Sequence, residues 1–331
     1  MVEYSNSVRV AVIQDSSEIM DKEACITKIE KLSTEAAKEG AKIVLFPEAF
    51  IPGYPRGLYF GTKIGSRLDK GKQDFARYWK NSLTIPGEDI LLLANVAKKN
   101  SIYLIVGIIE KDSEFSGGTL YCTIVYFSPE GILLGKHRKL KPTGSERLIW
   151  GEGDGSTLTV IESPYGKIGG LICWENYMPL ARTAMYSKGI DIYVAPTADA
   201  RDEWIASMKH IALEGRCFVL SSNQFVTKEM YPKDLACYDE LKNSPEILCR
   251  GGSIIIDPSG KVLDGPLYDK AGILYADLDL TAIPRSRFDF DVVGHYSRPD
   301  VFQLIINEEK MSSVTKKTKK RDILEIKKNK K

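Results

Sequence analysis

The chain has 331 residues, of which 43% are hydrophobic and 27% are charged, a composition typical of a globular protein with a large core. No apolar run approaches the roughly 18 residues that a membrane-spanning helix requires, and the first residues lack the basic and apolar segments of a signal peptide. We therefore expect a cytosolic protein without a membrane partner.

The formal net charge of +2 is unevenly distributed along the chain. Ten of the 46 lysines and arginines lie between Lys310 and Lys331, so the preceding chain is mildly acidic. An acidic body does not attract nucleic acid, and we expect no nucleic-acid partner. The basic end, residues 308–331, is typical of a solvated tail.

The six cysteines are scattered, form no C-x-x-C pair and are accompanied by only three histidines. Zinc ribbons and thioredoxin-like sites need tighter spacing, so neither is expected. In a reducing cytosol, most of these thiols are expected to be buried and to pack like small hydrophobic groups.

Short apolar runs alternate with stretches of helical periodicity. Strands are predicted over 8–13, 42–46, 102–109, 121–127, 132–134, 158–161, 167–172, 190–195, 218–222, 253–256 and 273–277. Helices are predicted from an N-cap at Asp21 to a stop at Gly40 and over 89–98, 179–187 and 203–213. This alternation favours helices packed on the faces of sheets, and turns such as SPEG add antiparallel strands. We expect one α/β domain over 8–307.

Glu48 is the first candidate for chemistry. It follows the apolar run KIVLF in the stretch LFPEAFIPGYPRG, at the carboxyl end of a predicted strand, where open α/β sheets place their sites. Aromatic neighbours would desolvate its carboxylate and raise its pKa toward that of a general base. A carboxylate that simply faces water at a strand end is an equally open interpretation.

A basic stretch, GKHRKLKPTGSER, is the second candidate. As a nucleic-acid patch it is short and isolated, whereas one lysine held near a developing negative charge would stabilise a tetrahedral intermediate. Periodicity does not choose among the lysines, because residues 137, 139 and 141 would share one face of an extended strand. Glu146, next to Arg147, could hold such a lysine by an ion pair, or form only a surface pair that contributes little.

The third candidate is Cys173 in KIGGLICWENYMPL, which is either a packed thiol or a nucleophile. A nucleophilic thiol needs a base. None of the three histidines is suitably spaced, and His210 sits in a helical run where a structural role is favoured. Adjacent residues commonly point apart, which counts against Glu175. A set of carboxylate, lysine and cysteine is the more economical interpretation.

Five stretches in one order resemble the nitrilase superfamily of carbon–nitrogen hydrolases, and its true nitrilase branch of plant and bacterial aliphatic and arylacetonitrile type. They are FPEAFIPGYPRG, GKHRKLKPTGSERLIWGEGDGS, GGLICWENYMPLARTAMYSKGIDIYVAPTAD, MKHIALEGRCFVLSSNQF and VGHYSRPDVFQL. The resemblance implies a four-layer α-β-β-α sandwich that dimerises into an eight-layer sandwich and often grows into spiral homo-oligomers. Lys228–Arg250 and the basic tail depart from what can be matched, which leaves the assembly open.

The resemblance also implies roles for individual residues. Glu48 matches the general base, Lys139 the lysine that stabilises the tetrahedral intermediate, Cys173 the nucleophile and Glu146 an accessory glutamate. Residues implied to line the substrate pocket are Tyr54, Trp150, Trp174, Pro196 and Thr197.

The implied reaction is hydrolysis of an organic nitrile to its carboxylic acid and ammonia through a cysteine thioimidate and thioester, without a metal or cofactor. The Cys-Trp-Glu tripeptide favours nitrilases over the amidase and carbamoylase branches. An amidase using the same residues, and a non-catalytic scaffold or thiol sensor with the same fold, remain the alternatives. The preferred nitrile is open among aliphatic, arylacetonitrile and cyanoalanine types.

Overall fold

The computed structural model describes residues 5–115 and 117–314 and contains two large sheets. The first has the order β16 (Gly272–Asp279), β1 (Ser7–Gln14), β2 (Ile43–Leu45), β6 (Tyr103–Lys111), β7 (Leu120–Phe127) and β8 (Leu133–Arg138), with β5 (Leu83–Thr84) also beside β6. Strands β1, β2 and β6 run parallel in its middle, β16 and β7 pair antiparallel with β1 and β6, and β8 pairs antiparallel with β7, so β8 runs in the direction of the central strands.

The second sheet repeats this plan. Its order is β13 (Phe225–Thr227), β14 (Ile247–Ile256), β12 (Phe218–Ser221), β11 (Ile192–Val194), β10 (Gly166–Gly170) and β9 (Val160–Ser163), with β15 (Val262–Tyr268) also beside β14. Strands β10, β11 and β12 are parallel, and the others pair antiparallel. Each sheet therefore has three central strands whose carboxyl ends meet at one edge.

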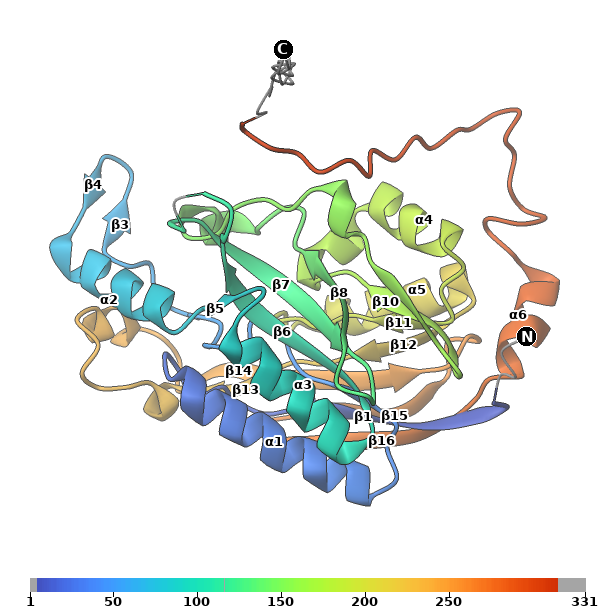
Figure 1. The fold of residues 1–331 in the computed structure, drawn as a ribbon, viewed down its shortest axis with the longest axis horizontal. Coiled ribbons are helices and arrows are strands. Elements are labelled where there is room, and N and C mark those ends of the chain that lie inside the picture. Colours follow the sequence, from blue (N-terminus) through green and yellow to red (C-terminus); the bar gives the residue numbers. More distant parts are fainter. Residues whose placement is uncertain (1–4, 116, 315–331) are drawn as a thin grey trace, which may run out of the picture.

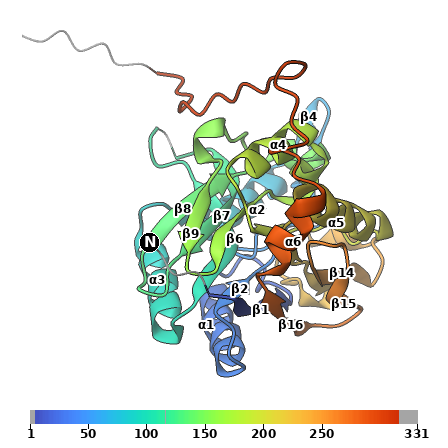
Figure 2. The ribbon, with the colours of Figure 1, turned by 90° about the vertical axis from the view of Figure 1, so that its right-hand side faces the viewer.

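Helices cover the outer faces of both sheets. α1 (Lys22–Lys38) and α3 (Glu88–Asn100) lie on the first sheet, and α4 (Pro179–Ser187) and α5 (Asp202–Gly215) lie on the second (Figures 1 and 2). Along β1, Val10 and Val12 pack in the core between the sheets, whereas Ala11 and Ile13 pack in the core under the helices. This alternation is what a strand with two buried faces produces. The result is the expected four-layer α-β-β-α sandwich.

The residues predicted to start and stop the first helix, Asp21 and Gly40, lie at its two ends. The Asp21 carboxylate accepts the N–H of Ala24 at 3.0 Å, and Gly40 has a φ of 88°, which glycine adopts without strain. Cys25, Ile29 and Ala36 recur on its buried face. Helical periodicity therefore located this element correctly because its apolar face packs on a sheet.

Several elements were not predicted. They are α2 (Asp69–Lys80), α6 (Ala282–Asp289), the short hairpin β3 (Thr62–Lys63) and β4 (Ser66–Arg67), and strands β5, β13 and β15. α2 has the sequence DKGKQDFARYWK, in which only Gly71, Asp74 and Tyr78 are buried, so it carries little apolar pattern. The hairpin into β8 was predicted, but this strand continues to Arg138 rather than ending at 134.

After α6 the chain contains no further helix or strand within the described residues, and Figure 1 shows residues 290–314 running along the outside of the sandwich. Residues beyond 307 still contact the body, because the N–H of Met311 donates to Asp154 at 2.8 Å. Most of the predicted basic tail, residues 315–331, lies outside the described residues. None of the helices in the described part of the chain is both long enough and apolar enough to cross a membrane.

Candidate active site

The three main candidates converge in space although they are far apart in the chain. Glu48 lies just after β2 in the first sheet, and Cys173 lies just after β10 in the second, so the two are brought together by the facing of the sheets. Lys139 directly follows β8 and is fully buried, as is Glu48. The carboxyl ends of β2, β10 and the edge strand β8 therefore form the site, at the end of the strands where α/β sheets place their sites.

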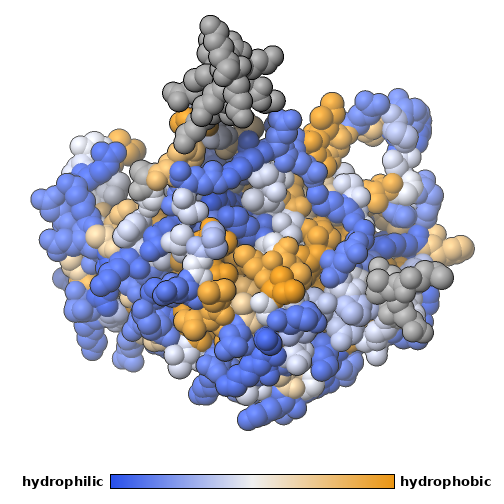
Figure 3. Space-filling model, viewed as in Figure 1, coloured by the Kyte–Doolittle hydropathy of each residue, from blue (hydrophilic) through white to orange (hydrophobic). Residues whose placement is uncertain are grey.

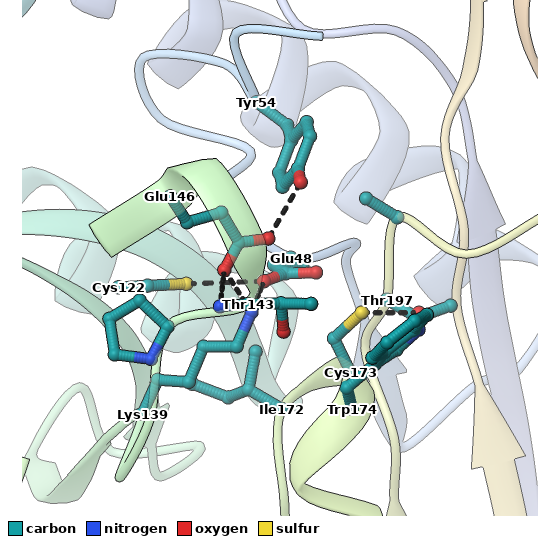
Figure 4. A network of polar contacts seen from close by, with 12 residues as sticks. Glu48, Tyr54, Cys122, Lys139, Thr143, Glu146, Ile172, Cys173, Trp174 and Thr197 are labelled. Carbon is teal, nitrogen blue, oxygen red and sulfur yellow. Dashed lines mark hydrogen bonds and ion pairs between the residues drawn. The ribbon is translucent and has the colours of Figure 1, made fainter. Parts of the chain in front are cut away.

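A buried lysine joins two carboxylates. Lys139 Nζ donates to Glu48 Oε1 at 2.7 Å and to Glu146 Oε2 at 2.8 Å (Figure 4). Glu146 is held in turn by the Tyr54 hydroxyl at 2.6 Å and by the N–H of Thr143 at 2.7 Å. Glu146 thus pairs with Lys139 in the interior, so the alternative of a surface pair is wrong.

The electrostatics of this cluster place the proton affinities far from their usual values. Burial raises the pKa of Glu48, Lys139 lowers it and Glu146 raises it, with a net increase. Burial alone would lower the pKa of Lys139, but Glu48, Cys173 and Glu146 raise it well above its usual value. Lys139 is therefore a permanent cation, and Glu48 is a carboxylate whose affinity for a proton suits a general base.

Cys173 stands at a strained turn at the end of its strand. Its φ is 50°, which is uncommon for a residue with a side chain, and its N–H donates to the Pro196 carbonyl at 2.9 Å. The Thr197 hydroxyl donates to the Cys173 Sγ at 3.1 Å. Burial, followed by the charge of Glu48, raises the pKa of this thiol. The strained φ is typical of a residue held for function, whereas the raised pKa keeps the resting thiol protonated, so a base must take its proton before it can react.

Glu48 has one carboxylate oxygen left for chemistry. Its Oε1 accepts Lys139 and also the Cys122 thiol at 3.6 Å, while its buried Oε2 has no hydrogen-bond partner in the described part of the chain. Figure 4 shows this second oxygen on the side of the Cys173 sulfur. A buried, unpaired carboxylate oxygen is costly, and facing a thiol it is placed to take a proton.

Glu175, next to the cysteine in sequence, points away from the thiol. Its Oε2 accepts the N–H of Ile172 and its Oε1 accepts the N–H of Leu140, both at 2.7 Å. The same carboxylate lies 3.0 Å from Nε2 of His137, whose Nδ1 lies 2.9 Å from the Thr157 carbonyl. Sequence reasoning gave His137 no role, yet it is fully buried here.

A cavity of about 560 Å³ opens onto the site. Tyr54, Glu146, Cys173 and Trp174 line it, and the indole N–H of Trp174 donates to Asp199 at 2.8 Å. The other lining residues are Arg56, Thr143, Ala198, Asp199, Ala200, Arg201, Ile247, Leu248, Arg250 and Asp269.

The remaining residues predicted for the pocket lie elsewhere around the site. Trp150 lines a neighbouring cavity of about 230 Å³, packs edge to face on Tyr54, and lies with its ring centroid 5.7 Å from Lys139 Nζ. Pro196 and Thr197 contact the backbone and sulfur of Cys173. They therefore hold the cysteine and do not line the main cavity.

The arrangement has the parts of nucleophilic catalysis: a thiol, a carboxylate with a free oxygen beside it, and a fixed cation 2.7 Å from that carboxylate. No cluster of three or more His, Cys, Asp or Glu side chains within residues 5–115 and 117–314 is arranged to hold a metal ion. The groups described here can exchange a proton between thiol and carboxylate and stabilise negative charge beside the lysine.

Comparison with known proteins places this geometry in a family. Residues 9–288 match the carbon-nitrogen hydrolase family. The chain is 54% identical over 307 residues to the aliphatic nitrilase of Sinorhizobium fredii, covering 92% of this chain and 97% of that protein. It is 53% identical over 313 residues to a bifunctional nitrilase/nitrile hydratase of Lupinus angustifolius, covering 93% and 88%.

A solved structure supports the fold. A nitrilase-superfamily protein of Saccharomyces cerevisiae aligns with a TM-score of 0.69 at 24% identity, covering 89% of this chain and 98% of that one. Similarity of this extent in sequence and in architecture leaves one assignment. The chain belongs to the carbon-nitrogen hydrolase family, with relatives named nitrilases along most of its length.

Proposed function

We propose that the protein is a nitrilase, which hydrolyses an organic nitrile to its carboxylic acid and ammonia. The observation that carries this proposal is the buried Glu48 carboxylate, which is bonded to Lys139 through one oxygen and keeps the other free on the side of Cys173. Nitrilase relatives at about half identity support the choice of substrate class.

The first half of the reaction forms a thioimidate. Glu48 takes the proton of the Cys173 thiol as sulfur attacks the nitrile carbon, one bond of the triple bond becomes a lone pair on nitrogen, and this nitrogen takes up the proton. Because the pKa of Cys173 is raised mainly by burial, thiolate forms only as it reacts. The Thr197 hydroxyl bonds to the sulfur and eases its deprotonation.

The second half releases ammonia and then the acid. Glu48 takes a proton from a water molecule while the oxygen of that water adds to the thioimidate carbon. The tetrahedral intermediate forms beside the Lys139 cation. Protonation of the nitrogen and loss of ammonia leave a thioester, which a second water hydrolyses to the acid and the free thiol. Glu146 keeps Lys139 in place and ionised through its ion pair at 2.8 Å.

The same tetrahedral intermediate has a second exit. If the carbon–sulfur bond breaks before the carbon–nitrogen bond, the product is the amide. The relative from Lupinus angustifolius is named a bifunctional nitrilase/nitrile hydratase, and we infer that a fraction of the product of this protein is amide as well. Which bond breaks first depends on whether the protonated Glu48 delivers its proton to nitrogen in time.

The test is a panel of aliphatic, arylacetonitrile and amino-acid nitriles, with ammonia, acid and amide measured for each. Ammonia and acid from nitriles, with slow turnover of the matching amides, support a nitrilase, whereas preferred turnover of amides would make it an amidase. Cys173→Ala should abolish turnover, and a trapped thioester seen by mass spectrometry should disappear with it. Unchanged turnover in that variant would refute the assignment of the nucleophile.

Exposed hydrophobic side chains on the outer surface support the proposal of a homo-oligomer. The outer helices expose Leu180, which is 68% exposed on α4, and Leu213 on α5, and Figure 3 shows further hydrophobic surface near β8 on the face seen there. A contiguous hydrophobic patch on a protein surface often marks an interaction site. We propose a homodimer that stacks two sandwiches into eight layers and extends into larger spirals. Mass measurement of Leu180→Glu beside the natural protein tests this, and an unchanged mass would contradict it.

The cytosol is the compartment that the thiols favour. All six cysteines are free and buried, which is typical of a reducing environment. We propose a cytosolic enzyme whose catalytic domain spans 8–307, and fluorescence microscopy of a tagged protein tests the location.

A further inference from the structure

Three arginines line the cavity above Cys173, and one of them differs from the other two. Arg201 is exposed and bonds to Asp199, with Nη2 at 2.6 Å from the carboxylate. Arg250 is exposed, lies within 4.0 Å of Asp202 and Asp269, and stacks on Tyr268. Both guanidinium groups at the mouth are therefore exposed to solvent and already lie beside carboxylates.

Arg56 is partly buried and has no carboxylate within 4.0 Å anywhere in the described residues. The one hydrogen bond that its guanidinium makes there goes to the carbonyl of Ala198. Because guanidinium stays protonated at any relevant pH, this is a permanent cation in a partly dehydrated wall without a counter-ion.

The position of Arg56 is fixed close to the nucleophile. Its backbone carbonyl accepts the Tyr231 hydroxyl at 2.9 Å, and its guanidinium carbon lies 5.5 Å from the ring centroid of Tyr54. Ala198, to which the guanidinium bonds, directly follows Thr197, whose hydroxyl touches the Cys173 sulfur. A ligand group on Arg56 and a reacting carbon on Cys173 therefore fit one small molecule inside the same cavity.

We propose that Arg56 is a specificity residue that binds a carboxylate carried by the nitrile substrate, so that the favoured substrates are cyano-carboxylic acids. This rests on the proposed nitrile hydrolysis. A carboxylate supplies the missing counter-ion and matches the fork of the guanidinium with two parallel hydrogen bonds. The hydrolysis product would then be a dicarboxylate.

A purely structural role is the competing explanation. Arg56 could serve only to hold the Ala198 carbonyl, or to offset the negative charge of Glu48 and Glu146. Either role would affect charged and neutral nitriles alike, because both need the same Cys173 geometry. A change in the preference between them is therefore the informative quantity.

The experiment compares ω-cyanopropanoate and ω-cyanobutanoate with nitriles in which an isopropyl group replaces the carboxylate. The natural protein should favour the acids, and Arg56→Gln should lower the ratio of kcat/KM for acid over isostere by at least about thirtyfold, which is typical for losing one partner of a desolvated charge pair. Arg56→Lys should recover part of the ratio, since it keeps the charge but not the fork. Arg250→Gln, which also removes one positive charge from the cavity wall, is the matched control and should change the ratio no more than about threefold.

A binding measurement separates the two proposals. Calorimetry on the Cys173→Ala variant should show that ω-cyanobutanoate binds more tightly than its isopropyl isostere. Adding Arg56→Gln to this variant should remove the difference in affinity. If neutral nitriles are hydrolysed as well as the acids and Arg56→Gln leaves the ratio unchanged, the carboxylate site is wrong while nitrile hydrolysis stands. If no nitrile is hydrolysed at all, the proposed function fails first.

Discussion

The carboxylate of Glu175 accepts the N–H of Leu140 at 2.7 Å, although the two residues are 35 positions apart. Leu140 follows Lys139, and the other oxygen of Glu175 accepts the N–H of Ile172, which precedes Cys173. One side chain therefore ties the backbone beside the lysine to the backbone beside the nucleophile and sets their separation. The same carboxylate lies 3.0 Å from Nε2 of His137.

Replacing this carboxylate should damage catalysis without touching a reacting group. Glu175→Gln puts an amide N–H₂ against one of two buried backbone N–H groups, which leaves that group unpaired at a cost of about 1–3 kcal/mol. We expect a lower melting temperature and a kcat at least about tenfold lower, because a small displacement of a catalytic group is costly. Melting curves and nitrile kinetics measure both, with Glu162→Gln on β9 as an exposed control. A variant that loses stability but keeps its kcat would show that the tie is only structural.

Features with a local sequence pattern could be predicted from the sequence, whereas contacts between distant segments could not. Apolar runs located the central strands of both sheets but missed β5, β13 and β15. A resemblance of five motifs selected Lys139 among three lysines, which periodicity did not. His137 left no signal because its partners, Thr157 and Glu175, are 20 and 38 residues away. Pairings of that kind arise only when two sheets face each other, and local patterns do not contain them.

Arg56 and Cys122 illustrate the same limit. Arg56 stands inside the quoted stretch FPEAFIPGYPRG, and the role proposed for it depends on having no carboxylate within 4.0 Å among the described residues. Cys122 is one of six buried thiols, and contact with Glu48 at 3.6 Å distinguishes it. α2 was missed because its role, covering one end of the fold with a mostly charged surface, needs few apolar residues.

The pH dependence of catalysis should report Glu48. Its pKa is raised mainly by burial and further by Glu146, so kcat/KM is expected to fall on acidification with a midpoint above the ordinary value of 4.5. Glu146→Gln removes a negative charge that raises the pKa of Glu48 and leaves Lys139 paired with Glu48 alone. The acidic limb should therefore move to lower pH while the maximal rate falls. A limb that stays in place would mean that another group controls it.

Removing the thiol of Cys122 should shift the acidic limb of the pH profile in the opposite direction, to higher pH. Its thiol donates to Glu48 Oε1, and a hydrogen bond to the charged form of a carboxylate lowers its pKa. Cys122→Ala is thus expected to raise the pKa of Glu48 and move the acidic limb to higher pH. Cys217→Ala, a buried thiol in the core under α4 and α5, is the matched control and should give the natural profile. Equal shifts in both variants would point to loss of packing instead.

Stability should depend on pH through His137. Burial lowers its pKa, but the Glu175 carboxylate and the hydrogen bonds around the ring raise it above 6.5 overall. A raised folded-state pKa gives stability that is complete below the unfolded value and is lost as the pH rises through the folded value. His137→Gln should thus cost more free energy of unfolding at pH about 6 than at pH about 9, as urea melts would show. A constant cost would mean that the ring is neutral at both pH values.

The hydroxyl of Thr197 should control the reactivity of the nucleophile. Burial and then Glu48 raise the pKa of Cys173, whereas Lys139 and the Thr197 hydrogen bond lower it. Thr197→Val keeps the shape but removes the donor 3.1 Å from the sulfur, so the pKa of Cys173 rises further. We expect alkylation of Cys173 by iodoacetamide at fixed pH to slow by about three- to tenfold, since one pKa unit corresponds to a tenfold change in thiolate.

The N–H of Asp199 also loses its acceptor in Thr197→Val, which should cost about 1 kcal/mol of stability. Thr183→Val, on an exposed hydroxyl of α4, controls for the substitution itself. Alkylation that remains as fast as in the natural protein would show that the Thr197 hydrogen bond does not lower the pKa of Cys173.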